Sequence, residues 1–304
     1  MGFELTILGS SSAAPIYDRH PTAQLLTICD HVLLIDCGEG TLMQLLNFRI
    51  KYHKISRIFI SHLHGDHYLG LLGLISTFHL QGRTSDLHIY GQQELMDIIE
   101  LQLRISNTHL RYNLIFHAVR HYTPEIIFED DEIIVRSIVL NHRVPCTGFV
   151  FLEKHRPRKL RIEKLQEYNI PFTYFNRIRM GDNFHTMEGE IILNDTLTFP
   201  PSKPRSYAYC SDTLFEPHIA DEVKEVDLLY HEATFLHEQA ERAALTYHST
   251  CLQAAEIALN ANVGKLLIGH FSARYRELHP LLNEARSLFP KTELALEGRK
   301  FKID

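Results

Sequence analysis

The sequence lacks a long apolar segment. No apolar run approaches the roughly 18 to 20 residues that a membrane-spanning helix needs. Residues 1–9 have the pattern of a strand and lack the basic-then-apolar order of a secretion signal. We therefore expect no membrane association and a cytoplasmic location.

Cysteine is scarce, and its spacing excludes two kinds of site. The count is odd, and no two cysteines form a C-x-x-C pair, so a disulfide framework or a cysteine zinc site is not expected. We expect all of them to be reduced and mostly buried packing residues. The five are Cys29, Cys37, Cys146, Cys210 and Cys251.

An excess of positive charge is also missing. The chain has 31 basic and 37 acidic residues, a formal net charge of −6, which argues against a protein coated in positive charge for nucleic acid. A local basic patch remains possible. With 304 residues, 45% of them hydrophobic, and no low-complexity tract, the chain can bury a large core in one domain or in two halves sharing one core.

Apolar runs separated by turn residues predict two groups of strands with helices between them. In the first half we expect strands over 3–10, 23–29, 31–38, 54–61, 87–90, 114–120 and 133–140, and helices over 39–48 and 92–105. In the second half we expect strands over 206–210, 227–230, 265–268 and 292–303, and helices over 249–262 and 278–289. Two similar halves of this kind predict an α/β fold, an αββα sandwich.

Residues 152–190 follow a strand but carry no clear period of their own. Pro157, Pro171 and Gly181 interrupt the segment. We therefore expect a single domain over 1–304 from which approximately 152–190 projects as an inserted arm.

The strongest local signal is the six-residue stretch from His62 to His67, which reads His-Leu-His-Gly-Asp-His. It directly follows the apolar strand that ends at Ile60, and packing does not explain three imidazoles and a carboxylate at this spacing. These ligand types suit zinc. Residues i and i+2 can face one metal while i+4 and i+5 reach a second, with Gly65 allowing a tight turn.

Further ligands of a two-metal site are expected just after apolar strands, where loops converge. His142, Asp212 and His270 each stand in such a position. Each alone could be a polar residue at the end of a strand, but together with the first cluster they form a plausible ligand set.

The cluster and these later residues resemble the metallo-β-lactamase superfamily and, within it, the short form of the ribonuclease Z (tRNase Z) family. The resemblance covers nearly the whole chain, and the stretches 231–234 and 270–275 are its most specific parts. It is carried by residues 8–10 with Pro15 and Arg19, 36–41, 61–73, 211–213, 231–234, 248–250 and 270–275.

This resemblance implies a metallo-β-lactamase αββα sandwich with a protruding arm and two zinc ions per subunit. One zinc would be held by His62, His64 and His142. The other would be held by Asp66, His67 and His270. Asp212 would bridge the two ions.

The resemblance also implies a reaction: a zinc-dependent endoribonuclease that removes the 3′ trailer from precursor tRNA. Hydrolysis would leave a 3′-hydroxyl on the tRNA and a 5′-phosphate on the trailer. Asp66 would bind metal and orient the attacking water. His248 would donate the proton that the leaving 3′ oxygen needs, with Glu232 as its partner.

A basic segment and two residues of the 270–275 stretch are the candidates for RNA binding. Between residues 151 and 180 the chain has eight basic and three acidic residues with aromatics interleaved, a pattern typical of nucleic-acid binding, although a solvated basic loop would look the same. The candidates are Arg274 and Ser272 near the scissile bond, and Lys154, Arg156, Arg158, Lys159 and Arg161 in the arm. For Arg19 we expect a solvated charge.

In the ribonuclease Z family the arm grips the elbow of tRNA, and short forms act as homodimers, so we expect both here. The sequence departs from the family at three places. Residues 169–176 replace a stretch rich in glycine and proline. Leu42 stands where glutamine is frequent, and His20 where asparagine is frequent.

Two other functions share part of this pattern. Another hydrolase of the same fold, acting on a small phosphodiester, thioester or lactone, would share the metal cluster but would need no basic arm. A non-catalytic RNA-binding protein would keep zinc for stability only, and would be expected to have lost one of the catalytic residues.

Overall fold

A computed structural model describes residues 2–154, 157–187, 189–201 and 203–304. The chain forms two compact units. The first comprises Met1–Leu152 and Arg205–Asp304, and the second comprises Glu153–Pro204. No helix among the described residues is both long and apolar enough to cross a membrane.

The first unit contains two seven-stranded sheets. In the first sheet the strand order is β16-β1-β2-β3-β4-β5-β6. Strands β3 to β6 are parallel, and β16, β1, β2 and β3 pair antiparallel. Their bounds are β1 Gly2–Gly9, β2 Ala23–Cys29, β3 His31–Cys37, β4 Arg57–Phe59, β5 Leu87–Gly91, β6 Leu114–Ala118 and β16 Lys300–Lys302.

The second sheet has the order β15-β14-β13-β12-β9-β8-β7. Strands β12 to β15 are parallel, and β9 pairs antiparallel with β12. Their bounds are β7 Ile126–Glu129, β8 Ile133–Leu140, β9 Cys146–Glu153, β12 Ser206–Cys210, β13 Leu228–Glu232, β14 Leu266–Gly269 and β15 Thr292–Leu294.

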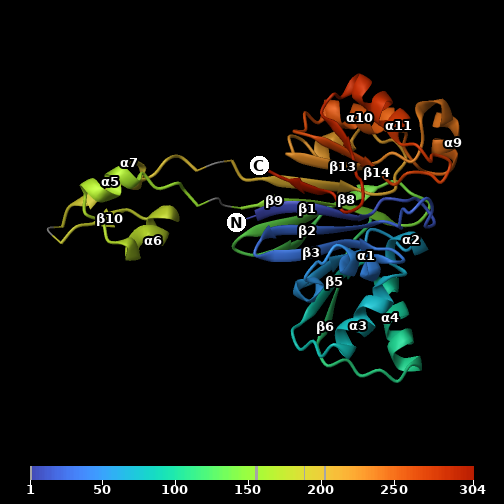
Figure 1. Cartoon of the computed structure of the whole chain (residues 1–304), viewed down its shortest axis with the longest axis horizontal. Coiled ribbons are helices and arrows are strands. Elements are labelled where there is room, and N and C mark those ends of the chain that lie inside the picture. Colours follow the sequence, from blue (N-terminus) through green and yellow to red (C-terminus); the bar gives the residue numbers. More distant parts are fainter. Residues whose placement is uncertain (1, 155–156, 188, 202) are drawn as a thin grey trace. The chain divides into compact units, whose positions relative to one another are not determined.

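Helices lie on the outer faces of the two sheets, as the lower and upper parts of the first unit show (Figure 1). One group covers the first sheet: α1 Thr41–Asn47, α2 Gly65–Tyr68, α3 Leu71–Leu80 and α4 Gln93–Ile105. The other covers the second sheet: α8 Ile219–Glu222, α9 Ala240–Leu245, α10 Cys251–Asn260 and α11 His279–Leu288. The short helices η1 Tyr52–Lys54 and η3 His237–Gln239 complete the unit.

Three apolar clusters separate these four layers. In β3, Leu33 and Ile35 point into the cluster between the sheets, whereas Leu34 packs under α1 and α3. This alternation follows from the two-residue period of a strand. The cluster between the sheets is rich in aromatic rings. Phe59 stacks on Tyr90 at 4.7 Å between ring centroids and meets Phe149 of the other sheet at 5.5 Å.

The predicted αββα sandwich is confirmed, and most predicted elements are present with shorter bounds. The five cysteines are free and buried, as expected. Helix α10 begins as predicted, because Thr250 forms a capping box with Gln253. Strands β7 and β9 were not among the predicted ranges.

One predicted strand was wrong. The expected closing strand over 292–303 is two strands, β15 in the second sheet and β16 in the first. Gly298, with a φ of +76°, lies between them and lets the chain turn. The apolar period alone does not reveal which sheet each half joins.

The second unit has a small core of its own. It contains α5 Ile162–Glu167, η2 Phe172–Tyr174, α6 Phe175–Arg179, the hairpin of β10 Phe184–His185 and β11 Ile191–Ile192, and α7 Asn194–Leu197. It extends past residue 190, where the predicted arm ends, because Ile192 and Leu197 pack into this core. The buried residues are Leu165, Ile170, Ile178, Phe184, Ile192 and Leu197.

Two glycines at the start of α3, its N-cap Gly70 and Gly73 in its first turn, provide a matched test of packing. A Cβ on Gly70 would lie 2.2 Å from the carbonyl oxygen of Gly38, whereas a Cβ on Gly73 would meet nothing within 4 Å. We expect Gly70→Ala to lower the free energy of unfolding by about 1 to 3 kcal/mol, because backbone must shift to relieve the overlap. Gly73→Ala should raise it by about 0.5 to 1 kcal/mol, because alanine favours the helix.

The midpoint of urea unfolding measures both effects. Equal midpoints for the two variants would contradict the close approach of the α2–α3 junction to the end of β3.

Candidate metal centre and active site

The ends of several strands converge at one edge of the first unit, and the residues that follow them form a single site. Ser61 to His67 follow β4, His142 follows β8, Asp212 follows β12, and His270 follows β14. All seven side chains predicted as ligands are brought together in two groups, within each of which the nearest ligand atoms lie within 4.8 Å of one another. The groups are His62, His64, His142 and Asp212, and Asp66, His67 and His270. A third group, Asp212, His248 and His270, shares one residue with each of them.

In the first group the imidazoles present three nitrogens to one point. His64 Nδ1 lies 3.1 Å from His62 Nε2 and 3.1 Å from His142 Nε2. In the second group Asp66 Oδ2 lies 3.4 Å from His270 Nε2 and 3.5 Å from His67 Nε2.

Asp212 divides its carboxylate between the two groups. Its Oδ2 lies 3.7 Å from His62 Nε2 and 3.9 Å from His142 Nε2. Its Oδ1 lies 3.3 Å from His270 Nε2 and 3.5 Å from His67 Nε2. One oxygen therefore faces each group, which is the arrangement of a carboxylate that bridges two cations.

The spacing of these atoms fits metal ions. Two ligand atoms held at about 2.0 to 2.1 Å from a tetrahedral zinc stand roughly 3.3 Å apart, close to the distances found here. Two of the atoms, His67 Nε2 and Asp212 Oδ1, are buried and have no hydrogen-bond partner among the described residues. Buried polar atoms rarely stay unpaired, so a cation between them would satisfy both.

The pKa values of the histidines also fit a site for positive charge. Burial lowers the pKa of His62 and His142, which favours the neutral imidazole that a metal needs. Burial also lowers the pKa of His67, but Asp212, Asp66 and Asp36 more than offset this and raise it well above its ordinary value. The carboxylates thus attract positive charge to the site, either as a proton or as a metal ion.

A residue that the sequence analysis did not assign, Asp36, orients part of this site. Its Oδ2 lies 2.8 Å from His67 Nδ1 and accepts hydrogen bonds from Ser61 Oγ and Tyr209 OH. Its Oδ1 accepts from the Ser61 amide at 2.7 Å. Asp36 is fully buried and has a φ of +53°. Two sequence signals pointed to it, its position at the end of β3 and its place in the stretch 36–41 that carries the family resemblance.

The outward-facing nitrogens of two other imidazoles are also held. His270 Nδ1 lies 2.9 Å from Thr234 Oγ1, and His142 Nδ1 lies 2.9 Å from the carbonyl oxygen of Tyr247. These contacts turn each Nε2 toward the site. Asp66 is fixed by the amide of Ala13, which donates to Oδ2 at 2.8 Å.

His248 and Glu232 form a pair beside the metal centre. His248 Nδ1 lies 2.9 Å from Glu232 Oε1, and Glu232 accepts further hydrogen bonds from the amides of Thr213 and Thr234. Burial lowers the pKa of His248, but Glu232 and Asp212 raise it to about 9. The carboxylates therefore favour the protonated imidazole, with Nε2 left for another partner.

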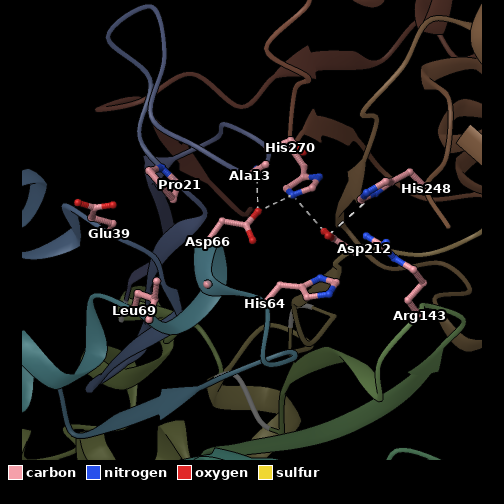
Figure 2. Close-up of a pocket in the computed structure, with 12 residues that line it drawn as sticks. Ala13, Pro21, Glu39, His64, Asp66, Leu69, Arg143, Asp212, His248 and His270 are labelled. Atoms are coloured by element: carbon pink, nitrogen blue, oxygen red, sulfur yellow. Dashed lines mark hydrogen bonds and ion pairs between the residues drawn. The ribbon is translucent and has the colours of Figure 1, made fainter. Parts of the chain in front are cut away.

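A cleft of about 330 Å³ opens over the site. Figure 2 shows Asp66, His64, Asp212 and His270 at its centre, His248 and Arg143 on one wall, and Pro21, Glu39 and Leu69 on the other. Arg143, Glu39 and Ala13 were not among the residues predicted to form the site.

Two of the residues predicted to bind RNA, Ser272 and Arg274, are in the first unit. Ser272 and Arg274 follow His270 but do not line the cleft, and Arg274 Nη1 donates to Gln239 Oε1 at 3.3 Å. In the second unit Arg158 is paired with Asp195, so its charge is already compensated.

The other predicted arm residues differ in their surroundings. Arg161 donates to the carbonyl oxygen of Thr198 and lies 4.7 Å over the ring of Phe199. Lys159 is exposed and Lys154 is half-buried. Arg156 lies outside the described residues.

The expectation of a solvated Arg19 was wrong. Only 9% of this residue is exposed, and its Nη2 donates to the carbonyl oxygen of Tyr275 at 2.9 Å. Arg19 therefore joins the loop after β1 to the loop after β14, next to the cleft. Loop position in the sequence carries no information about this burial.

Comparison with known proteins decides the family. A ribonuclease Z of Bacteroides thetaiotaomicron is 48% identical over 302 residues, which cover 99% of this chain and 96% of that protein. The chain belongs to the ribonuclease Z family. A ribonuclease Z of Bacteroides fragilis is also 48% identical, over 97% of each chain.

Solved structures also support membership in this family. The short form of human tRNase Z is 27% identical, covers 99% of each chain and superposes with a TM-score of 0.73. Bacillus subtilis YhfI, described as a metallo-β-lactamase fold protein, has a TM-score of 0.70 at 19% identity and shows the fold alone. A family model described as anti-Pycsar protein Apyc1 matches residues 3–143, less than half of the chain.

Membership in this family identifies the protein as a hydrolase of the metallo-β-lactamase fold, and its histidine and aspartate groups are able to bind metal.

The role of Asp36 can be tested by Asp36→Asn. The amide cannot stabilise the imidazole of His67 as the carboxylate does, so we expect the affinity for zinc to fall roughly 10- to 100-fold. Competition with a chelating dye measures the affinity. Asp131→Asn, an exposed position, is the control. Unchanged affinity in Asp36→Asn would show that His67 needs no such partner.

Proposed function

We propose that this ribonuclease Z family member is a zinc-dependent endoribonuclease that removes the 3′ trailer from precursor tRNA. The observation that carries the proposal is the combination of a two-group ligand site, divided by Asp212, with the paired His248 and Glu232 on the wall of the same cleft. We infer the substrate, precursor tRNA, from similarity to proteins named ribonuclease Z and tRNase Z.

Two zinc ions are the cofactors that the donor set fits best. His62, His64 and His142 would hold one, Asp66, His67 and His270 the other, with Asp212 shared. When bound, two such ions supply a nucleophilic water and charge compensation for a phosphodiester. Asp66, fixed by the Ala13 amide, would orient that water toward phosphorus.

His248 is the proton donor in this proposal. A ribose 3′ oxygen is a poor leaving group unless it receives a proton as the bond to phosphorus breaks. The buried carboxylate of Glu232 favours the protonated imidazole. Because it holds Nδ1, the Nε2 of the same ring is the atom left to face the substrate. The products would be a tRNA with a 3′-hydroxyl and a trailer with a 5′-phosphate.

The second unit would be the RNA-binding arm. Residues 153–204 contain nine basic and seven acidic residues, a net charge of +2 in a chain of −6. Lys164 and Arg177 are paired with acidic neighbours, which leaves Lys159 and Arg179 as exposed cations for phosphates. Phe172, 80% exposed, offers a ring on which a base can stack.

Two further parts of the proposal rest on the family resemblance. The protein would act as a homodimer in which the arm of one subunit holds the tRNA that the other subunit cuts. It would act in the cytoplasm, where precursor tRNA is available.

The alternative is a hydrolase of a small phosphodiester, thioester or lactone on the same fold. A diphosphatase of the PhnP family and yeast PDE1 share the fold at TM-scores of 0.64 and 0.61, with 16% and 12% identity. The His248–Glu232 pair and the basic second unit favour an RNA substrate.

The deciding experiment is cleavage of one precursor tRNA with a 3′ trailer, with and without a chelator, and mapping of the cut. Chelator-sensitive cutting just after the discriminator base supports the proposal. No cutting by protein shown to hold two metal ions would favour the small-molecule hydrolase.

The proton donor can be separated from the metal ligands. We expect His248→Ala to keep both metal ions while the turnover number falls roughly 10²- to 10⁴-fold, because the leaving oxygen loses its proton source. Metal analysis and single-turnover kinetics provide the two readouts. His109→Ala, an exposed histidine, should change neither. Full turnover of His248→Ala would place the proton donor elsewhere.

The arm can be tested by charge reversal. Lys159→Glu combined with Arg179→Glu should weaken binding of precursor tRNA at least tenfold at low salt and leave hydrolysis of bis(4-nitrophenyl) phosphate unchanged. Lys224→Glu with Lys291→Glu makes the same change in net charge on the first unit and should preserve binding. If both double variants lost the same binding affinity, the loss would come from the change in net charge and would not identify the arm as the binding site.

A further inference from the structure

Arg143 is a cation of the cleft wall that no predicted motif includes. It follows His142 in the turn between β8 and β9, and it is exposed. Figure 2 shows its side chain running along the wall of His248, toward Asp212. In the described part of the chain it forms no ion pair, so its charge is available to a ligand.

We propose that Arg143 binds the phosphate that precedes the scissile phosphate, on the 5′ side of the nucleotide that carries the leaving oxygen. This assignment rests on the proposed function. It makes Arg143 a residue that positions the RNA strand, separate from the groups that act on the scissile phosphate.

The place of His248 fixes the direction of the strand. His248 gives its proton to the leaving 3′ oxygen, so the nucleotide with that oxygen must lie against the wall of His248. The next anion toward the 5′ end is the phosphate on the other side of that nucleotide. Arg143, on the same wall, is the nearest candidate cation for it among the residues that line the cleft.

The charges on the two walls agree with this direction. The opposite wall carries the exposed carboxylate of Glu39 beside Pro21 and Leu69. A phosphate on that side would be repelled by Glu39, whereas a phosphate beside Arg143 is attracted. A guanidinium can also donate two parallel hydrogen bonds to one phosphate, which fixes the position of the strand as well as its charge.

The scissile phosphate does not need Arg143. The two groups of ligands surround the centre of the cleft, and the cations that they would hold would compensate the charge on that phosphate. For a second phosphate outside the centre, the residues that line the cleft offer no other arginine or lysine. Arg143 therefore distinguishes an RNA strand from a small phosphodiester, which has no second phosphate.

The experiment is a double-mutant cycle between the residue and the phosphate. Two synthetic precursor tRNAs are compared, one natural and one with a neutral methylphosphonate at the linkage before the last tRNA nucleotide. On the natural RNA we expect Arg143→Ala to lower kcat/KM roughly 10- to 100-fold, as for the loss of a hydrogen bond to a charged group. On the methylphosphonate RNA, wild type and variant should be equal.

Three further readouts separate strand positioning from a structural effect. Arg143→Ala should keep its full metal content and should hydrolyse bis(4-nitrophenyl) phosphate at the wild-type rate. The slope of log kcat/KM against log salt should fall by about one on natural RNA. Arg143→Lys, which keeps the charge but not the paired hydrogen bonds, should recover part of the loss. Arg104→Ala, an exposed arginine on α4, is the control.

Several outcomes would overturn the assignment. An unchanged kcat/KM on natural RNA would exclude any contact. A loss that persists on the methylphosphonate RNA would mean that Arg143 binds elsewhere. An equal loss on the small phosphodiester, or a loss of metal in both Arg143 variants, would assign it to the metal centre. Absence of cleavage by the wild-type protein would overturn the proposed function as well. This outcome can therefore be distinguished from those that overturn only the role of Arg143.

Discussion

The position of Asp212 between two groups of imidazoles is the constraint on which the rest of the site depends. Its two oxygens face different groups, and neither can move without losing one of them. A fully buried carboxylate is costly unless it is surrounded by positive charge or donors. Histidines from both sheets supply that surrounding, and they do so only because the ends of β4, β8, β12 and β14 meet at one edge.

Rigidity of this edge comes from the layers beneath it. The ring of Phe59 in the first sheet packs against Phe149 in the second, while Asp36 and Thr234 fix the imidazoles from behind. The same arrangement buries Glu232 and turns it toward His248. The predicted metal ligands and the His248–Glu232 pair are therefore neighbouring parts of one supported surface.

The two walls of the cleft carry charges of opposite sign. Arg143 and His248 are on one wall and Glu39 is on the other, so an anionic strand is not equally stable in both orientations. The second unit carries the exposed cations Lys159 and Arg179, and it has a core of its own. In the proposed function, recognition of a long RNA and reaction at one phosphate would use different residues.

The sequence by itself determined the elements and the candidates for chemistry. Strand periodicity located β3 and β12, and the spacing from His62 to His67 indicated metal, because both are local properties of a short segment. Only the tertiary structure decided how these parts meet. It assigned β15 and β16 to different sheets, buried Arg19, and put Asp36 behind His67 and Arg143 beside His248. Each of those relations joins residues far apart in the chain or depends on which way a side chain points, and neither property leaves a periodic signal in the sequence.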